Sequence, residues 1–161
     1  MNDHNKTFIV LDNVRSAFNV GAIFRTSDAS DVTCIYLVGI TPKPPLEKLK
    51  KTSIGAIDYV EWKYFETIDE AIEDIKKIEP ATIIYGIEQK SNARLYYDAD
   101  LSLGSAAFIV GHEILGVSDR SIALCNQVLE LPMHGKKNSL NVATTAGIVL
   151  YERARQMSKN S

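Results

Sequence analysis

Short runs of apolar and β-branched residues recur along the chain and predict buried strands. The runs cover Thr7 to Leu11, Thr33 to Val38, Tyr59 to Trp62, Thr82 to Ile87, Ala106 to Val110 and Val128 to Leu131. Capping residues between these runs mark four helices. The helices are expected at Asn19 to Ser30, Thr67 to Ile78, Ser118 to Cys125, and from Asn138 or Ser139 to Ala154. Because strands and helices alternate, we expect an α/β fold with a mostly parallel sheet and helices on both faces.

The last predicted helix follows a loop that holds Lys136 and Lys137. Ser139 and Asn141 lie at the expected start of that helix. A helix N-terminus beside cations favours an anionic or carboxylate-bearing ligand. A generic strand–loop–helix corner is the alternative interpretation.

Small residues share one face of the same helix, where Ala143, Ala146 and Gly147 follow one another at helical spacing. Such a face lets another backbone approach closely. We expect it to pack against a partner chain, with burial inside one subunit as the alternative.

The composition is that of a globular protein, with 161 residues, 45% hydrophobic and 24% charged. This length suits a single domain spanning residues 1–161. Cys34 and Cys125 lie in apolar runs and indicate reduced core thiols of a cytoplasmic protein. No apolar run approaches the length of about 18 residues that a membrane span requires, so no membrane contact is expected. The net charge is −2, but lysines cluster around residues 43–51, and a locally basic face can hold a phosphate backbone.

The first predicted helix carries Gly21 and Arg25 one helical step apart. Because helical side chains lean towards the N-terminus, we expect Arg25 to reach back over Gly21 to Asn19. A guanidinium beside free backbone N–H groups suits a phosphate. The alternative is a surface arginine paired with Asp28 or a neighbour.

Two glycines, Gly111 and Gly116, bracket Glu113 directly after a predicted strand. Glycine lets a ligand come close to backbone amides, and Glu113 would bind a cationic or hydroxyl-bearing group or cap a helix. The histidines and cysteines lack metal-ligand spacing, so no metal is expected. The phosphate-binding motifs of dinucleotide and nucleoside triphosphate sites are also missing.

Three motifs together resemble those of the SpoU (TrmH) family of RNA 2′-O-ribose methyltransferases, within the SPOUT superfamily. They are Asn19-x-Gly-x-x-x-Arg25-Thr, Gly111-x-Glu-x-x-Gly116 and Leu131-Pro-Met-x-Gly-x-x-x-Ser139-Leu-Asn141-Val. The resemblance extends from about Phe8 to Arg155. We expect a single methyltransferase domain, without the extra RNA-binding domain that some family members carry. The resemblance implies a deep trefoil knot in the C-terminal part and a homodimer that completes the active site across its interface.

The resemblance also implies S-adenosylmethionine as the methyl donor and a tRNA or rRNA as the acceptor. The implied donor-binding residues are Ile87, Gly111, Gly116, Leu131, Met133, Ser139 and Leu140. The implied catalytic residues are Arg25, Asn19, Glu113, Ser139 and Asn141. We expect Arg25 to clamp phosphate and stabilise the developing alkoxide, because arginine holds its proton too tightly to act as a base. A non-catalytic RNA-binding or assembly module with the same knot is the alternative, and a nucleotide-dependent oxidoreductase is disfavoured by the missing dinucleotide motif.

Overall fold

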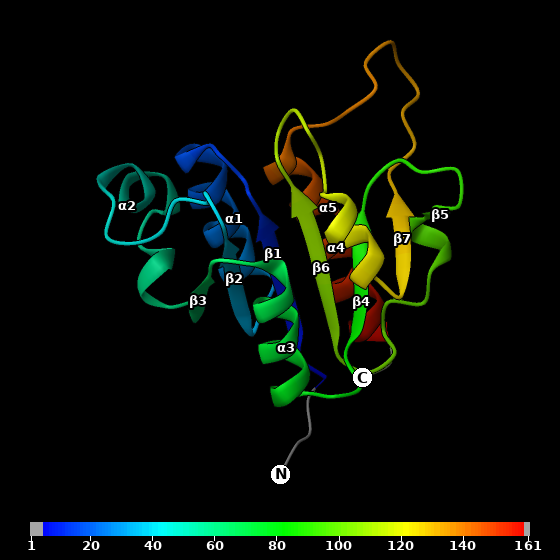
Figure 1. Cartoon of the computed structure of the whole chain (residues 1–161), viewed down its shortest axis with the longest axis horizontal. Coiled ribbons are helices and arrows are strands. Elements are labelled where there is room, and N and C mark those ends of the chain that lie inside the picture. Colours follow the sequence, from blue (N-terminus) through cyan, green and yellow to red (C-terminus); the bar gives the residue numbers. More distant parts are fainter. Residues whose placement is uncertain (1–4, 160–161) are drawn as a thin grey trace.

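A seven-stranded parallel sheet forms the centre of the computed structural model, which describes residues 5–159 (Figure 1). Its strands, in the spatial order β3-β2-β1-β6-β4-β7-β5, are β1 Thr7–Asp12, β2 Cys34–Val38, β3 Trp62–Phe65, β4 Ile83–Ile87, β5 Arg94–Leu95, β6 Ala106–Gly111 and β7 Gln127–Glu130. The helices are α1 Ala17–Ala29, α2 Glu47–Ser53, α3 Ile68–Ile78, α4 Asp119–Leu124 and α5 Val142–Lys159, with short 3-10 turns at Ala56–Asp58 and Tyr96–Asp98. The predicted α/β class and parallel sheet are confirmed.

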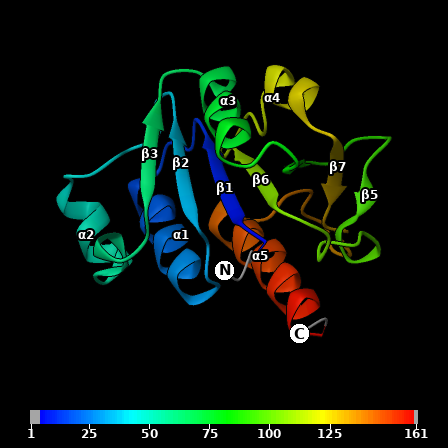
Figure 2. The same ribbon diagram turned by 90° about the horizontal axis from the view of Figure 1, so that it is seen from below.

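Helices cover both faces of the sheet, as the alternating pattern predicted (Figure 2). Ile9 and Leu11 of β1 belong to the core cluster beneath α1 and α5. Phe8 and Val10 point the other way, into the cluster beneath α3. This alternation is the two-residue period of a strand, and with both faces buried the strand reads as one continuous apolar run.

Two strand predictions were wrong in detail. The strand expected at Tyr59 to Trp62 is Trp62–Phe65, and Tyr59 is exposed just after a 3-10 turn. β3 is an edge strand paired only with β2, and its residues are half-buried, which hides the strand in the hydrophobic pattern. β5, which the hydrophobic pattern did not predict, has only two residues in the polar stretch after β4 and pairs with β7.

Two helix starts also differ from the prediction. Ser16 caps α1, because its side chain accepts a hydrogen bond from the backbone N–H of Asn19. Asn141 caps α5, accepting from the N–H groups of Ala143 and Thr144 at 2.8 and 3.2 Å. Residues 138–140 therefore lie in the loop before the helix.

The small-residue face of α5 packs against α1 within the subunit. Ala146 is fully buried, and a side chain on Gly147 would come within 3.8 Å of the Thr26 methyl group. The alternative of burial inside one subunit therefore holds for Ala146, whereas Ala143 and Gly147 are only half-buried and a partner chain over them stays a prediction.

A buried arginine fastens the last helix to the first strand. Arg153 donates to the Thr7 hydroxyl at 2.7 Å and to the carbonyls of Leu101, Lys6 and Gly104. Desolvation lowers its pKa to about 10, yet these acceptors satisfy the guanidinium. Among residues 5–159, no helix is long and apolar enough to span a membrane.

Candidate active site

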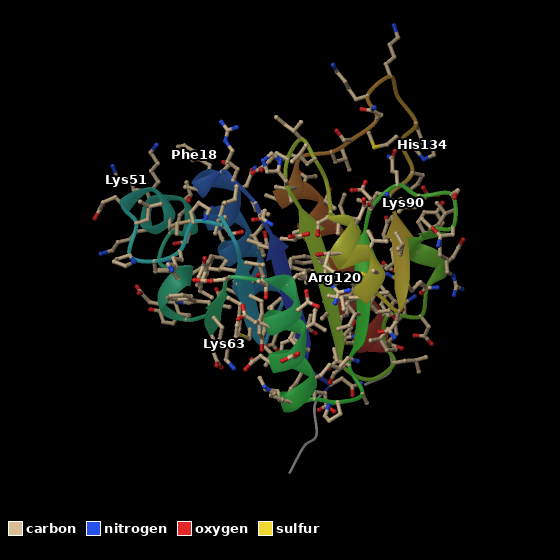
Figure 3. All side chains as sticks on the ribbon, in the orientation of Figure 1. Phe18, Lys51, Lys63, Lys90, Arg120 and His134 are labelled. Atoms are coloured by element: carbon tan, nitrogen blue, oxygen red, sulfur yellow. The ribbon has the colours of Figure 1, made fainter. Side chains whose placement is uncertain are left out.

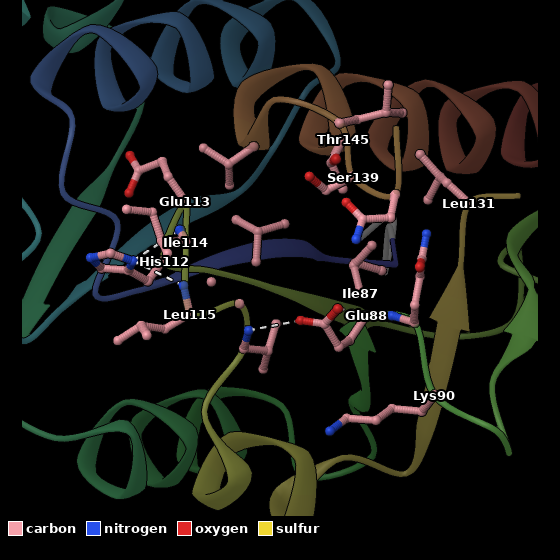
Figure 4. Close-up of a pocket in the computed structure, with 18 of the residues that line it drawn as sticks. Ile87, Glu88, Lys90, His112, Glu113, Ile114, Leu115, Leu131, Ser139 and Thr145 are labelled. Carbon is pink, nitrogen blue, oxygen red and sulfur yellow. Dashed lines mark hydrogen bonds between the residues drawn. The ribbon is translucent and has the colours of Figure 1, made fainter. Parts of the chain in front are cut away.

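A cavity of about 510 Å³ opens at the carboxyl ends of β4, β6 and β7, beside the start of α5 (Figure 4). This is the edge where ligands of parallel sheets collect. Residues from three separate loops line it, including every residue expected to bind the methyl donor: Ile87, Gly111, Gly116, Leu131, Met133, Ser139 and Leu140. The fold thus brings these seven residues together around one cavity. Their role in binding the methyl donor stays a prediction.

The loop after β6 folds back on itself to form one wall of the cavity. The N–H of His112 donates to the carbonyl of Gly116 at 3.1 Å, and the reverse bond is 2.8 Å. A Cβ on Gly111 would lie 2.3 Å from the Gly116 backbone, and Gly116 itself has φ +73°. Both glycines are therefore needed for the loop's own close packing. Both also line the cavity, so the expectation that they let a ligand approach the backbone stays a prediction.

Glu113, at the tip of this loop, joins the loop to the start of α1. Its carboxylate accepts from the backbone N–H groups of Arg15 and Ser16, both at 2.9 Å, and from the Asn19 amide at 3.0 Å. Burial alone would raise the pKa of Glu113, but these hydrogen bonds outweigh it and lower the pKa to about 2. Of the interpretations offered for Glu113, capping a helix is the one that these bonds to the start of α1 bear out.

Asn19 connects this loop to the loop before α5. Its side-chain oxygen accepts from the Asn141 amide at 3.0 Å, while its own amide donates to Glu113. The side-chain oxygen of Asn141 is left to cap α5. A single chain of side-chain hydrogen bonds therefore runs from Glu113 through Asn19 to the N-terminus of α5.

Arg25 lies on the exposed face of α1, outside the set of residues that line the cavity. Within residues 5–159, no hydrogen bond or ion pair joins it to Asn19 or to Asp28. The exposed position is the one that the alternative interpretation expected, without the pairing to Asp28, and the role of Arg25 in binding an anion stays a prediction. Gly21 is explained by a different neighbour. A Cβ there would sit 1.7 Å from the Thr52 hydroxyl, so Gly21 allows α2 to pack against α1.

Sequence reasoning missed Glu88, which lines the cavity directly after β4. Its carboxylate accepts from the N–H of Val117 at 3.0 Å and from the N–H of Gln89 at 2.9 Å. Its position at the carboxyl end of a central strand was the signal that could have found it. His112 was also missed; its Nδ1 accepts from the N–H groups of Ile114 and Leu115 and shapes the loop tip.

Across the described part of the chain, no group of three or more His, Cys, Asp or Glu side chains could hold a metal ion. The residues around the cavity offer backbone groups, carboxylates, amides and hydroxyls to a ligand. Such a site can orient a small molecule through several polar contacts beside a few apolar side chains.

The sequence is similar to those of RNA methyltransferases from other organisms. The chain is 31% identical over 151 residues to the tRNA (guanosine(18)-2′-O)-methyltransferase of Thermus thermophilus, covering 94% of this chain and 75% of that protein. It is 28% identical to the 23S rRNA (guanosine-2′-O-)-methyltransferase RlmB of Xanthomonas axonopodis pv. citri, covering 92% of this chain and 58% of that protein. The chain thus spans little more than half the length of some relatives.

The fold also matches solved structures. The SpoU methyltransferase AviRb from Streptomyces viridochromogenes, solved in complex with AdoMet, superimposes with a TM-score of 0.89 at 23% identity. That match covers 97% of this chain and 62% of AviRb. A sequence model of the SpoU rRNA Methylase family matches residues 6–151, nearly the whole of the described chain. The chain therefore belongs to the SpoU rRNA methylase family.

Proposed function

We propose that the protein transfers a methyl group from S-adenosylmethionine to a ribose 2′-oxygen of a tRNA or an rRNA. The relatives named above carry out this class of reaction on tRNA and on 23S rRNA, according to their names. The observation that carries the proposal is the cavity at the carboxyl ends of β4, β6 and β7, which unites residues of the second and third sequence motifs. Asn19 of the first motif is hydrogen-bonded to Glu113 of the second and to Asn141 of the third. Within this proposal residues 1–161 act as one methyltransferase domain.

The cavity suits the donor in size and in chemistry. Its volume of about 510 Å³ falls in the range of small-molecule sites. Apolar walls from Ile87, Val110 and Leu131 suit an adenine ring and the methylene groups of the donor, and the Glu88 carboxylate and Ser139 hydroxyl suit hydroxyl and ammonium groups. When bound, adenosylmethionine supplies an activated methyl group on a sulfonium, so the protein must mainly position the acceptor and help remove one proton.

Glu113 acts as an anchor in this proposal. A general base needs a pKa near the working pH, and a carboxylate with a pKa of about 2 is a poor proton acceptor. Its oxygens are already engaged by Arg15, Ser16 and Asn19. Glu113 therefore holds the start of α1 against the cavity, and Asn19 and Asn141 extend that support to the loop of Ser139.

Arg25 acts as an electrostatic catalyst. Its guanidinium would bind the phosphate next to the target ribose and stabilise the negative charge that develops on the 2′-oxygen. The 2′-hydroxyl proton would leave to a phosphate oxygen or to water.

A homodimer would bring Arg25 to the cavity. Arg25 is exposed and does not line the cavity of its own chain, so we propose that a second copy supplies it. Ile114 and Leu115, both 81% exposed, form an apolar tip beside the cavity that such a partner would cover.

Mixing two inactive variants tests the shared site. Arg25→Ala lacks the guanidinium, and Ser139→Trp fills the cavity and blocks the donor. Random exchange of subunits makes about half of the dimers mixed. In a mixed dimer one site combines an open cavity with an intact Arg25, and the other site lacks both. The mixture should therefore regain about a quarter of the wild-type rate. If the mixture stays as inactive as either variant alone, each site is built from one chain.

We further propose the trefoil knot and a cytoplasmic location. After β7 the chain lines the cavity together with the loop that follows β6, and it then enters α5, which packs against α1. This path supports a threaded C-terminal segment. Both cysteines are free thiols, as expected in a reducing compartment.

The activity itself is tested with labelled adenosylmethionine and total RNA from a strain that lacks the protein. Label should enter tRNA or rRNA and should be recovered as a 2′-O-methylated nucleotide, whose position identifies the substrate. Donor binding without any transfer to either RNA would reject the enzyme and favour an RNA-binding module with the same fold.

A further inference from the structure

A second concave surface lies between the first turn of α1 and the start of α2, and it shares no lining residue with the cavity described above. This groove has a volume of about 600 Å³ and is lined by Arg15, Ser16, Ala17, Phe18, Leu46, Glu47 and Lys48. We propose that the groove binds a single-stranded segment of the RNA substrate, with Phe18 stacking on a base and Arg15, Lys48 and Lys51 contacting phosphates. The proposal rests on the proposed function, because it names where the acceptor RNA lies.

Phe18 is the central feature of the groove. Its side chain is 62% exposed, although a large aromatic ring normally gains by being buried. Burying it inside the subunit is prevented by its position, since the opposite face of α1 already packs on the core through Val20, Ile23 and Phe24. An exposed ring beside cations is the arrangement on which single-stranded nucleic acids stack their bases.

The charges around the ring favour an anionic partner. Arg15, Lys48 and Lys51 are exposed, and among residues 5–159 none of them forms an ion pair with a carboxylate. Glu47 is the one carboxylate among the described residues that line the groove. Figure 3 shows the side chains of Phe18 and Lys51 pointing into solvent at the same end of the molecule.

The rest of the molecule is charged differently. The acidic residues of the α3 region, which include Asp69, Glu70 and Glu73, lie on the opposite face of the sheet (Figure 2). α2 carries three lysines and one glutamate, whereas α3 carries four carboxylates and two lysines, so the balance of charge is positive on α2 and negative on α3. This separation orients a polyanion towards the groove and away from α3.

The groove also continues towards the residues proposed for catalysis. Phe18 and Arg25 are seven residues apart on α1, so they share its exposed face about 10 Å from one another along the helix axis. Phe18 also precedes Asn19, which bonds to Glu113 and Asn141. A strand lying in the groove would therefore lead its next nucleotides over Arg25.

The test measures binding of a fluorescent single-stranded oligouridylate of about 12 nucleotides to the full chain. Phe18→Ala should weaken binding roughly tenfold, because one base no longer has its stacking partner. Replacing Lys48 and Lys51 together by Ala should lower the slope of log Kd against log salt by about 0.7 for each phosphate that the variant no longer neutralises. Tyr97→Ala, another exposed aromatic, and Lys77→Ala on α3 serve as matched controls and should leave binding unchanged.

Two results would overturn the groove. One is oligouridylate binding by Phe18→Ala at wild-type affinity. The other is conversion of a dimer to a monomer by Phe18→Ala in light scattering, which would make the groove an interface between copies of this chain.

The outcome for the groove is separable from the outcome for the enzyme. Wild-type protein that methylates RNA while Phe18→Ala binds normally rejects the groove alone. Wild-type protein that binds oligouridylate through Phe18 but methylates no RNA keeps the groove and rejects the proposed function.

Discussion

Single residues carry the strongest constraints on the site, and Glu113 is the clearest of them. Its three hydrogen bonds tie the loop after β6 to the first turn of α1. The motif identified Glu113 as important, but spacing could not show its partners, because Arg15, Ser16 and Asn19 are about a hundred positions away in sequence. Gly21 illustrates the same limit. Helix spacing placed it beside Arg25, whereas the hydroxyl of Thr52 on another helix explains it.

The depressed pKa of Glu113 predicts how stability depends on pH. Its folded-state pKa of about 2 lies below the ordinary 4.5, so folding favours the ionised carboxylate. The resulting stability should be complete above about pH 5 and should be lost as pH falls towards 2. Glu113→Gln places an N–H donor among backbone donors, so it should be less stable than wild type at pH 6 and approach wild type near pH 3. Chemical unfolding at both pH values measures this, and an equal gap at both would contradict the assigned pKa.

At the scale of elements, the alternation of apolar strands and capped helices was sufficient to predict the sheet and its layers. It failed where local signals compete. Ser16 and Asn19 are both good capping residues, as are Ser139 and Asn141, and only tertiary contacts decide between them. Asn19 does not cap the helix, because its side chain is hydrogen-bonded to Glu113 and Asn141. β5 has only two residues, which is too short to give a hydrophobic pattern.

Asn141 should therefore contribute to both helix stability and donor binding. Asn141→Ala removes the cap of α5 and its link to Asn19, which should cost about 1 kcal/mol of stability. Because the loop of Ser139 and Leu140 is then less fixed, affinity for adenosylmethionine should also fall in calorimetry. Thr67→Ala, which removes the cap of α3, is the matched control: it should cost similar stability and leave donor affinity unchanged. Equal donor affinity in both variants would show that the α5 cap does not support the cavity.

At the scale of the whole molecule, the fold explains why residues far apart in sequence form one cavity. The carboxyl ends of β4, β6 and β7 meet at one edge of the sheet, and α5 returns to the same place. The motif resemblance anticipated which residues gather there, whereas hydrophobic periodicity predicted only that loops would. Neither could predict that Arg25 would lie outside the cavity, because that depends on how α1 is turned by its packing against α2 and α5.

The most direct measurement is single-turnover methyl transfer from labelled adenosylmethionine to the identified RNA by wild type, Arg25→Ala and Arg25→Lys. Loss of a preorganised charge from the developing alkoxide costs roughly 3–4 kcal/mol, so Arg25→Ala should be slower by about a hundredfold or more. Arg25→Lys keeps the charge but loses the planar fork, so it should also be severely impaired. Donor affinity and melting temperature should stay near wild type in both variants, because Arg25 is exposed and lies outside the cavity. Turnover of Arg25→Ala near the wild-type rate, or loss of its activity only through unfolding, would contradict the assignment of Arg25 to catalysis.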